Sequence, residues 1–589
     1  MNEKNAVDNT METAKPSGNN GSKVSSRRKF LGQVGAVLTG GAVFGKGVVA
    51  SAQSNETALR EAIDVPHTRT DPRVRKCFAI RLATANDEAR IAAAPQTTNG
   101  DEGLYHDKCG TYSKGLLQEG IGLVNLHAFR TFKRALDSGQ PADFENIVMG
   151  GTRTLNGPQG GLALGLEGSD GVQFGNAPCP DNQVNAVVVP PAPALASAAY
   201  GTELVELYWG SLLRDVAFTD YVSNATATEA AQELSAMPSY AGPRDDHGNV
   251  TPALLFRGGY AGETIGPYIS QLCITPSFLG AQEVTQQMAI YAADIDYMTD
   301  AATFQQVQNG IDTGLQNQLD VQSRFLHNGR GLATFTHVDV LYQAYFTAYL
   351  VLNTLGVPLN PGNPYANSRT QNGFGSFGQP DFAATVAAVA GFALNCVWYH
   401  KWYVHLRHRP ESGGAIVRQI LTSQGGTLDG SVNDNVLNST AVQRSFTRYG
   451  DYLLSQAFPE GSPTHPAYPT GHGTVAGACI TILKFFFDGE FVIPHPVVPG
   501  NDGLSLLPYT GVDAGQITVN GELNKLAHNI SFGHGIHAGI HWRSDTDASI
   551  QLGEALAISL LQDRALTYNE KFTVNFTKID GATATISNQ

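Results

Sequence analysis

Three segments of the chain gather residue types that can hold and act on an anion. The first runs from Lys401 to Arg409, is followed by Pro410, and ends a long apolar stretch. Pro410 disfavours helical geometry at Arg409, so a lysine on the last helical turns and an arginine just beyond them can converge on one point. Cations near a helix C-terminus also interact favourably with the helix dipole, which is an alternative, purely structural interpretation.

The second segment runs from His465 to Thr474 and places Thr470, Gly471 and His472 directly before an apolar run. A loop that enters a helix N-terminus offers free N–H groups and a partial positive charge, which together can hold an anion. Thr470 adds a hydroxyl group, and Gly471 lets the backbone approach a ligand closely. An ordinary threonine cap is the alternative interpretation, although the flanking His465 is unusual for a simple cap.

The third segment contains His534, His537, His541 and Asp545, which share one face if the segment is helical. Asp545 could then bond one ring nitrogen of His541 and leave the other nitrogen as a ligand. A zinc site is less favoured, because His534 and His541 would lie about 10 Å apart along a helix and no His-Glu-x-x-His motif is present. A buried core histidine is an adequate interpretation of His537 alone.

Taken in order, these segments resemble the vanadium-dependent haloperoxidase and type 2 phosphatidic acid phosphatase superfamily. The family signature has a lysine, an Arg-Pro pair, a Pro-Ser-Gly-His block, and an arginine preceding a histidine with an aspartate four residues later. The spacing of Lys401 and Arg409, the Arg-Pro-Glu ending and the chain length are most similar to the red-algal and cyanobacterial bromoperoxidase branch. The resemblance covers about residues 340–565.

The resemblance implies a vanadate-dependent haloperoxidase, which oxidises halide, with bromide or iodide favoured, to hypohalous acid with hydrogen peroxide. It also implies self-association into a homo-oligomer, and it leaves an organic substrate open as a further partner. By position the resemblance implies His541 as the vanadium ligand, supported by Asp545, and His472 as an acid–base with His465 nearby. It also implies that the vanadate oxygens are held by Lys401, Arg409, Thr470 and the Gly471 amide. Lys401 would in addition polarise bound peroxide.

Two positions depart from the family pattern. Thr470 replaces serine, and Gly535 occupies the position of the family arginine, six residues before His541. His534 is the nearest substitute for that arginine and is therefore included in the predicted cofactor site. Two alternatives stay open: a phosphatase that uses His541 as the phosphoryl-accepting nucleophile and His472 as the acid for the leaving group, or a catalytically weakened oxyanion-binding homologue.

The composition is that of a folded protein with a lightly charged surface, since only 15% of the residues are charged. The chain has 589 residues, a formal net charge of -14 and a pI near 5.6. An overall negative field argues against nucleic acid as a partner, because binding phosphates requires a basic surface. An anion bound by this protein must therefore be held by a local cluster that opposes the global charge.

The elements expected to position these segments are mainly α-helical. We predict packed helical bundles with long Gly/Pro-rich loops and few short strands. The predicted helices span residues 203–218, 228–235, 281–297, 338–355, 381–403 with Asp381 as N-cap, 441–457, 472–487, 521–541 and 545–565. The uncharged stretch 382–399 is nearly long enough to span a membrane, but its alanine-rich composition favours a buried helix, so no stable membrane span is expected.

The first residues have the order of a signal peptide. Arg27 and Arg28 precede Phe30 and Leu31, an apolar Gly/Ala-rich run follows, and small residues stand near position 50. Twin arginines in this context indicate export by the Tat system and a periplasmic or secreted location in a bacterium. We predict a Tat signal peptide over 1–52, an N-terminal helical region with a loop insertion over 53–300, and a C-terminal bundle with the oxyanion site over 301–589.

Overall fold

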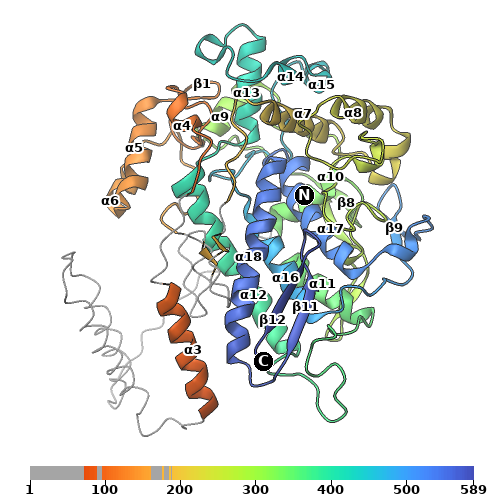
Figure 1. Cartoon of the computed structure of the whole chain (residues 1–589). Helices are drawn as coiled ribbons and strands as arrows, with labels where there is room; N and C mark the ends of the chain where they lie inside the picture. Colours follow the sequence, from red (N-terminus) through yellow and green to blue (C-terminus); the bar gives the residue numbers. More distant parts are fainter. Residues whose placement is uncertain (1–71, 89–95, 161–175, 178–184, 187–188) are drawn as a thin grey trace, which may run out of the picture. The chain divides into compact units, whose positions relative to one another are not determined.

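The computed structural model describes residues 72–88, 96–160, 176–177, 185–186 and 189–589 (Figure 1). Pro72–Gln589 form one compact unit. The predicted signal peptide, 1–52, lies outside the described residues, and the predicted boundary near residue 300 stays a prediction. The expected mainly α fold is confirmed.

Helices make up most of the described elements. The α-helices are α3 (Pro72–Glu88), α4 (Asp101–Leu104), α5 (Leu126–Ser138), α6 (Pro141–Glu145), α7 (Ala198–Leu212), α8 (Ala225–Ser235), α9 (Ala301–Gln308), α10 (Gly329–Val338), α11 (Gln343–Thr354), α12 (Gln379–Tyr399), α13 (Pro410–Leu421), α14 (Asp434–Leu437), α15 (Thr440–Tyr449), α16 (Gly471–Phe486), α17 (Val519–Phe532) and α18 (Arg543–Thr567). Two π-helical turns are η5 (His400–His405) and η8 (Gly533–His537). The 3₁₀ turns are η2 (Phe218–Ser223), η3 (Pro252–Leu254), η4 (Gln271–Cys273), η6 (Gly426–Leu428) and η7 (Ala514–Gln516).

The strands are short and pair as antiparallel two-stranded ribbons within the described residues. The pairs are β1 (Gln118–Gly120) with β2 (Leu123–Val124), β3 (Asn176–Ala177) with β4 (Asn185–Ala186), β5 (Ser277–Leu279) with β6 (Gln282–Val284), β7 (Met288–Tyr291) with β8 (Leu319–Arg324), β9 (Val497–Pro499) with β10 (Leu506–Pro508), and β11 (Thr573–Thr577) with β12 (Thr583–Ser587).

Helix α16 is the centre of the hydrophobic core and packs against α12 and α18 (Figure 1). Two glycines allow α16 and α18 to approach closely. A Cβ atom on Gly477 would lie 2.0 Å from the Ile550 carbonyl oxygen, and one on Gly553 would lie 1.9 Å from the Thr474 carbonyl oxygen. This close packing brings the N-terminus of α16 next to the N-terminus of α18, where the second and third predicted segments begin their helices.

Several predicted helices are wrong in extent or type. Residues 281–297 form β6 and β7 instead of a helix, since β7 pairs with β8 across more than twenty residues of sequence. The predicted helix 338–355 forms only as α11, because residues 339–342 are a loop that separates α11 from α10. The predicted helix 441–457 is helical only as α15. The N-cap of α12 is Gly378, and Asp381 lies one turn later and accepts a hydrogen bond from the Phe377 amide at 2.8 Å.

The predicted helix 521–541 is also wrong at its C-terminal end. Helix α17 ends at Phe532, the π-turn η8 follows, and Gly539 adopts a left-handed φ of 84°. This reversal places His541 in the turn before α18 instead of on a shared helix face with His534 and His537. The histidine spacing therefore does not reflect one continuous helix.

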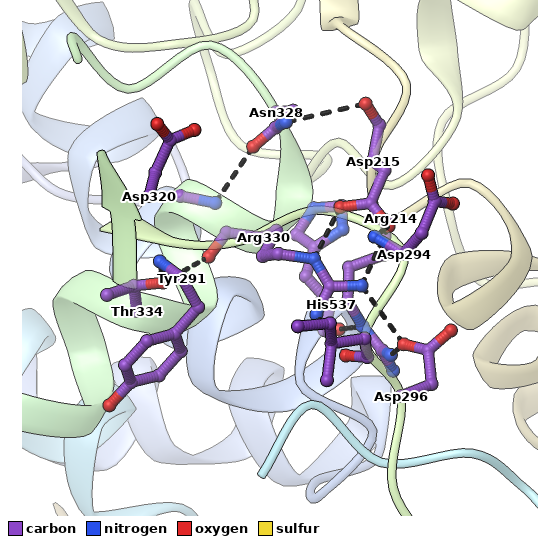
Figure 2. Close-up of polar contacts among 12 residues, drawn as sticks. Arg214, Asp215, Tyr291, Asp294, Asp296, Asp320, Asn328, Arg330, Thr334 and His537 are labelled. Carbon is purple, nitrogen blue, oxygen red and sulfur yellow. Dashed lines mark hydrogen bonds and ion pairs between the residues drawn. The ribbon is translucent and has the colours of Figure 1, made fainter. Parts of the chain in front are cut away.

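A buried ionic network holds η8 in place (Figure 2). Arg214 donates a hydrogen bond to the His537 carbonyl oxygen at 2.6 Å and pairs with Asp296. Arg330, near the start of α10, contacts Asp296 at 3.1 Å and Asp215 at 2.7 Å. Because these charges are paired and hydrogen-bonded, they can be buried, and they fix the backbone of η8 beside α10.

One described helix is long and apolar enough to cross a membrane by length and composition. It spans Gln379–His405 and combines α12 with η5; 44% of its most apolar window is buried. The core helices of soluble proteins can meet the same criteria of length and composition. Here α12 packs against α16 and α18. The expectation of a buried bundle helix fits this packing.

Candidate active site

The second and third predicted segments line one cavity, and Arg409 of the first segment contacts two of its lining residues, His465 and His541. The cavity has a volume of about 320 Å³, and its lining includes His465, Gly471, His472, His534 and His541. Residues 465–472 come from the loop before α16 and its first turn, whereas His534 and His541 come from η8 and the turn before α18. Packing of α16 on α18 therefore brings together residues that are about seventy positions apart.

Lys401 lies in η5 and is fully buried. Its Nζ donates hydrogen bonds to the carbonyl oxygens of Pro466 at 2.9 Å and Ala467 at 2.8 Å. Burial and the neighbouring Arg409 hold the pKa of Lys401 well below its usual value. Among the described residues no carboxylate bonds this ammonium group, so its direct partners are carbonyl oxygens, and Asp545 compensates its charge only from a distance.

Arg409 is the N-cap residue of α13 and is also buried. Its guanidinium group bonds the carbonyl oxygens of His465 at 2.9 Å and Ile540 at 2.9 Å, and it lies 2.8 Å from Nε2 of His541. Burial lowers the pKa of Arg409 to about 10. Like Lys401, it has no carboxylate partner in the described part of the chain.

A chain of ion pairs behind His541 fixes its ring. Its Nδ1 lies 2.9 Å from Oδ2 of Asp545, which also accepts a hydrogen bond from the Trp542 amide at 3.1 Å. The other carboxylate oxygen of Asp545 pairs with Arg407 at 2.7 Å, and Arg407 pairs in turn with Glu203 of α7 at 3.0 Å. This arrangement favours a proton on Nδ1 of His541 and leaves Nε2 unprotonated, so that it accepts from Arg409 here and can serve as a ligand atom.

The predicted contact between Asp545 and His541 is therefore present. It does not lie along one face of a helix, because His541 precedes α18 and Asp545 is in the first turn of α18. Arg407 and Glu203 were not predicted as site residues. Arg407 was visible as one of several cations in the first segment, but nothing local pointed to its partners. Glu203 lies about two hundred residues earlier, and no sequence signal connected it to the site.

The N-terminus of α16 is open for an anion. Thr470 is the N-cap residue, but its side chain makes no capping hydrogen bond, and its Oγ1 is buried without a partner in the described residues. The ordinary capping interpretation of Thr470 is therefore not supported. The first N–H groups of a helix lack intrahelical partners, so the Gly471 amide and the Thr470 hydroxyl are both available for a ligand.

His472 contacts a carboxylate that was not predicted. Its Nε2 lies 3.2 Å from Oδ1 of Asp339, in the loop between α10 and α11. The His472 side chain is 19% exposed and lines the cavity, so a bound reactant can reach it. Because the sequence suggested one helix over 338–355, Asp339 had no visible reason to turn towards His472.

His534 lies next to the other site histidines. Its ring centroid is 4.1 Å from that of His472 and 5.7 Å from that of His541. Burial, and then the nearby His472 and His541, hold the pKa of His534 well below its usual value. His534 is therefore uncharged here and can offer a hydrogen bond to an anion, but it does not replace the positive charge of an arginine at Gly535.

His465 and His537 have different surroundings. His465 lies 3.0 Å from the Arg409 guanidinium group and packs on Trp398 with ring centroids 4.6 Å apart. His537 points into the core, where its Nε2 lies 3.0 Å from the Tyr268 hydroxyl. The interpretation of His537 as a core histidine agrees with this position.

The residues present fit a compact oxyanion. Two buried cations without carboxylate partners, an unpartnered threonine hydroxyl and an uncapped helix N-terminus converge beside neutral histidines. Buried charges require compensation by an opposite charge or hydrogen bonds, and charge-assisted hydrogen bonds to oxyanions are strong. This donor set matches tetrahedral or trigonal oxyanions such as phosphate and vanadate.

Comparisons with known proteins identify the class. The VCPO second helical-bundle domain matches residues 381–569. A vanadium-dependent bromoperoxidase from Corallina officinalis is 31% identical over 604 aligned residues, covering 89% of this chain and 100% of the relative. A vanadium-dependent bromoperoxidase from Ascophyllum nodosum is 31% identical over 540 residues, covering 88% and 92%.

The fold agrees with these relatives. A homohexameric vanadate-dependent bromoperoxidase from Ascophyllum nodosum superposes with a TM-score of 0.80 at 26% identity, covering 87% of this chain and 90% of that one. Fold and site thus define a helical haloperoxidase. The chain belongs to the vanadium-dependent haloperoxidase family, in the branch of the algal bromoperoxidases.

Proposed function

We propose that this protein is a vanadate-dependent haloperoxidase that oxidises bromide to hypobromous acid with hydrogen peroxide. The observation that carries the proposal is the pair of buried cations, Lys401 and Arg409, which have no hydrogen-bonded carboxylate partner in the described residues. Arg409 lies 2.8 Å from Nε2 of His541, the atom that Asp545 leaves unprotonated. The bromoperoxidase names of the relatives support bromide as the halide.

The residues of the site have distinct roles in this proposal. Nε2 of His541 would hold vanadium, and Lys401, Arg409, the Thr470 hydroxyl and the Gly471 amide would hold the vanadate oxygens. His534 adds a neutral hydrogen-bonding group. When bound, vanadate supplies a Lewis acid that activates hydrogen peroxide for oxygen transfer to a halide without a change in the oxidation state of the metal.

His472 moves the proton that the reaction requires. Hydrogen peroxide, bromide and one proton give hypobromous acid and water. Asp339 holds Nε2 of His472, which leaves Nδ1 as the nitrogen that can exchange a proton with a reactant in the cavity. A positioned general acid–base of this kind contributes ~100- to 10,000-fold to a rate.

The test is a paired assay of apo protein and vanadate-loaded protein. Bromide oxidation by peroxide and hydrolysis of a phosphate monoester are measured on the same preparations. We expect bromide oxidation only after vanadate loading. Equal bromide oxidation by both forms would contradict the proposal, and so would phosphate ester hydrolysis that vanadate inhibits, because the latter result would identify the alternative phosphatase.

Export and assembly are further parts of the proposal. The Arg27-Arg28 pair supports export by Tat to a periplasmic or extracellular location. A fusion of residues 1–52 to a reporter should be exported, and Arg27→Lys with Arg28→Lys should abolish export. The homohexameric relative supports self-association, and light scattering of the full-length chain should therefore give a mass several times the 62.7 kDa of one chain.

A further inference from the structure

The proposed reaction takes up one proton for every bromide ion that it oxidises, and His472 must regain that proton after each turnover. The His472 side chain is only 19% exposed, and Asp339 holds its Nε2, so the proton has to reach Nδ1 from solvent. Hydronium that arrives at ~10¹⁰ M⁻¹ s⁻¹ delivers only about 100 protons per second at a pH of about 8. Enzyme turnover numbers are typically ~1 to 1,000 s⁻¹. Above neutral pH, a group that collects protons for His472 would therefore raise the rate.

A second cavity, of about 510 Å³, adjoins the site cavity. It is called the outer cavity here, and the site cavity is called the inner cavity. The outer cavity is open to solvent, because its lining includes the exposed residues Asp312, Leu315 and Gln316. Two titratable side chains, His337 of α10 and Glu460, line both cavities. A proton bound to either side chain is therefore accessible from both sides.

His337 and Glu460 are bonded to each other and held in a fixed geometry. Nε2 of His337 lies 2.6 Å from Oε1 of Glu460, and its Nδ1 lies 2.6 Å from the Tyr291 hydroxyl. The His337 ring is stacked on Phe458, with centroids 3.9 Å apart. The Tyr291 amide in turn donates a hydrogen bond to Oγ1 of Thr334 at 3.0 Å (Figure 2). A proton can thus move along the bond between His337 and Glu460 without rotation of either side chain.

The charges around this pair leave it ready to accept one proton. Burial, and then the charge of Glu460, raises the pKa of Tyr291 to about 12, so the Tyr291 hydroxyl stays protonated and donates to Nδ1 of His337. Although burial opposes it, the hydrogen bond from His337 lowers the pKa of Glu460. At rest the pair is therefore a carboxylate bonded to an imidazole N–H group. The other charged or titratable groups that face the pair, or line a cavity beside it, are Arg153, Lys114, Tyr297, His534, Asp312 and Asp339.

We propose that Glu460 and His337 form a relay that carries one proton per turnover from the outer cavity to His472. This inference rests on the proposed function, which makes proton uptake part of every turnover. Hydronium or a buffer acid protonates the pair from the outer cavity. The pair then gives a proton to water in the inner cavity, and this water protonates Nδ1 of His472. One proton enters and one leaves in each turnover, no electrons move, and the resting pair is restored.

The first experiment measures kcat for bromide oxidation by the vanadate-loaded full-length protein, with monochlorodimedone as the trap for hypobromous acid. Glu460→Gln keeps a hydrogen-bonding group beside His337 but cannot carry a proton. Glu229→Gln is the matched control, because Glu229 is equally exposed (32% against 31%) and pairs with Arg444, away from both cavity linings. We expect Glu460→Gln to lose about tenfold in kcat at a pH of about 8 but less than about twofold at about 5.5, where hydronium is ~300-fold more abundant. The control should follow wild type at both pH values.

Two further measurements separate a relay from a purely structural role of Glu460. Equilibrium dialysis, which needs no turnover, should give a vanadate affinity within about twofold of wild type for Glu460→Gln. Glu460→Asp should recover part of the lost kcat at a pH of about 8, because it restores a carboxylate. A clearly weaker vanadate affinity, or an equal loss of kcat at both pH values, would show that Glu460 only supports the site and would overturn the relay.

The second experiment tests whether the two residues act on one path. His337→Gln should show the same pH-dependent loss of kcat as Glu460→Gln, and the double variant should lose no more than the larger single loss, because members of one path are not additive. Losses that multiply in the double variant would contradict a shared relay. Absence of bromide oxidation by vanadate-loaded wild type would refute the proposed function. Active wild type with identical pH profiles for Glu460→Gln and Glu229→Gln would refute the relay alone.

Discussion

The most informative substitution in the site is Asp545→Asn. Asp545 is fully buried, and its two carboxylate oxygens bond His541 at 2.9 Å, the Trp542 amide at 3.1 Å and Arg407 at 2.7 Å. All three partners are donors. An asparagine has one acceptor oxygen and one donor NH₂ group in place of two acceptor oxygens, so it cannot satisfy both sides.

The magnitude follows from the two orientations open to the asparagine. If its oxygen faces Arg407, its NH₂ group meets Nδ1 of His541, which favours the tautomer with a protonated Nε2 that cannot bind vanadium. If the oxygen faces His541, the NH₂ group meets the buried Arg407, which loses one of its two carboxylate partners and keeps only Glu203. Either orientation loses a hydrogen bond to a charged group, about 1.5–3 kcal/mol. This corresponds to ~10- to 100-fold weaker vanadate binding.

The assay is equilibrium dialysis against vanadate, with thermal unfolding measured in parallel. Asp547→Asn is the matched control, because Asp547 lies on the same helix but contacts His528, 3.1 Å away, in place of His541. The control should bind vanadate as wild type does. If folded Asp545→Asn binds vanadate within about twofold of wild type, the reasoning about the His541 tautomer is wrong.

Two further predictions separate roles within the protein. His541→Ala should abolish vanadate binding, whereas His472→Ala should keep much of it and lose ~100- to 10,000-fold in turnover; equal loss of affinity would contradict this division. Although burial opposes its charge, Glu263 and Asp547 raise the pKa of His528 to about 9. The charged His528 therefore contributes its full stabilisation of the folded protein below its unfolded pKa of ~6.5. This contribution, at most about 3 kcal/mol of the free energy of unfolding, is lost as the pH rises through about 9. Urea unfolding between pH 6 and 10 should show this decline, and a parallel decline in His528→Asn would refute it.

The local sequence was sufficient for the parts of the site that depend on neighbouring residues. The Thr470-Gly471-His472 run correctly predicted a helix N-terminus, since α16 begins at Gly471. The Pro410 position correctly predicted that the chain turns after η5, and α13 starts there. Caps, prolines and helical periodicity act within one or two turns, so a single sequence contains them.

The sequence was insufficient where distant segments decide the backbone. The apolar spacing of residues 281–297 suggested a helix, but pairing of β7 with β8 stabilises strands there. The histidine spacing suggested one helix through His541, but η8 and the reversal at Gly539 interrupt it. In both cases the tertiary contacts outweigh the local propensity, which is a weak determinant on its own.

The sequence by itself therefore determined the candidate residues for the chemistry: two cations, a helix start and a histidine with its aspartate, in an order that resembles one superfamily. The tertiary structure decided how those residues are supported. It brought Asp339 to His472, joined Arg407 and Glu203 to Asp545, and turned His537 into the core. The residues in these contacts are roughly 130 to 340 positions apart or on opposite sides of a turn. Burial and charge pairing stabilise such contacts only once the helices have packed together.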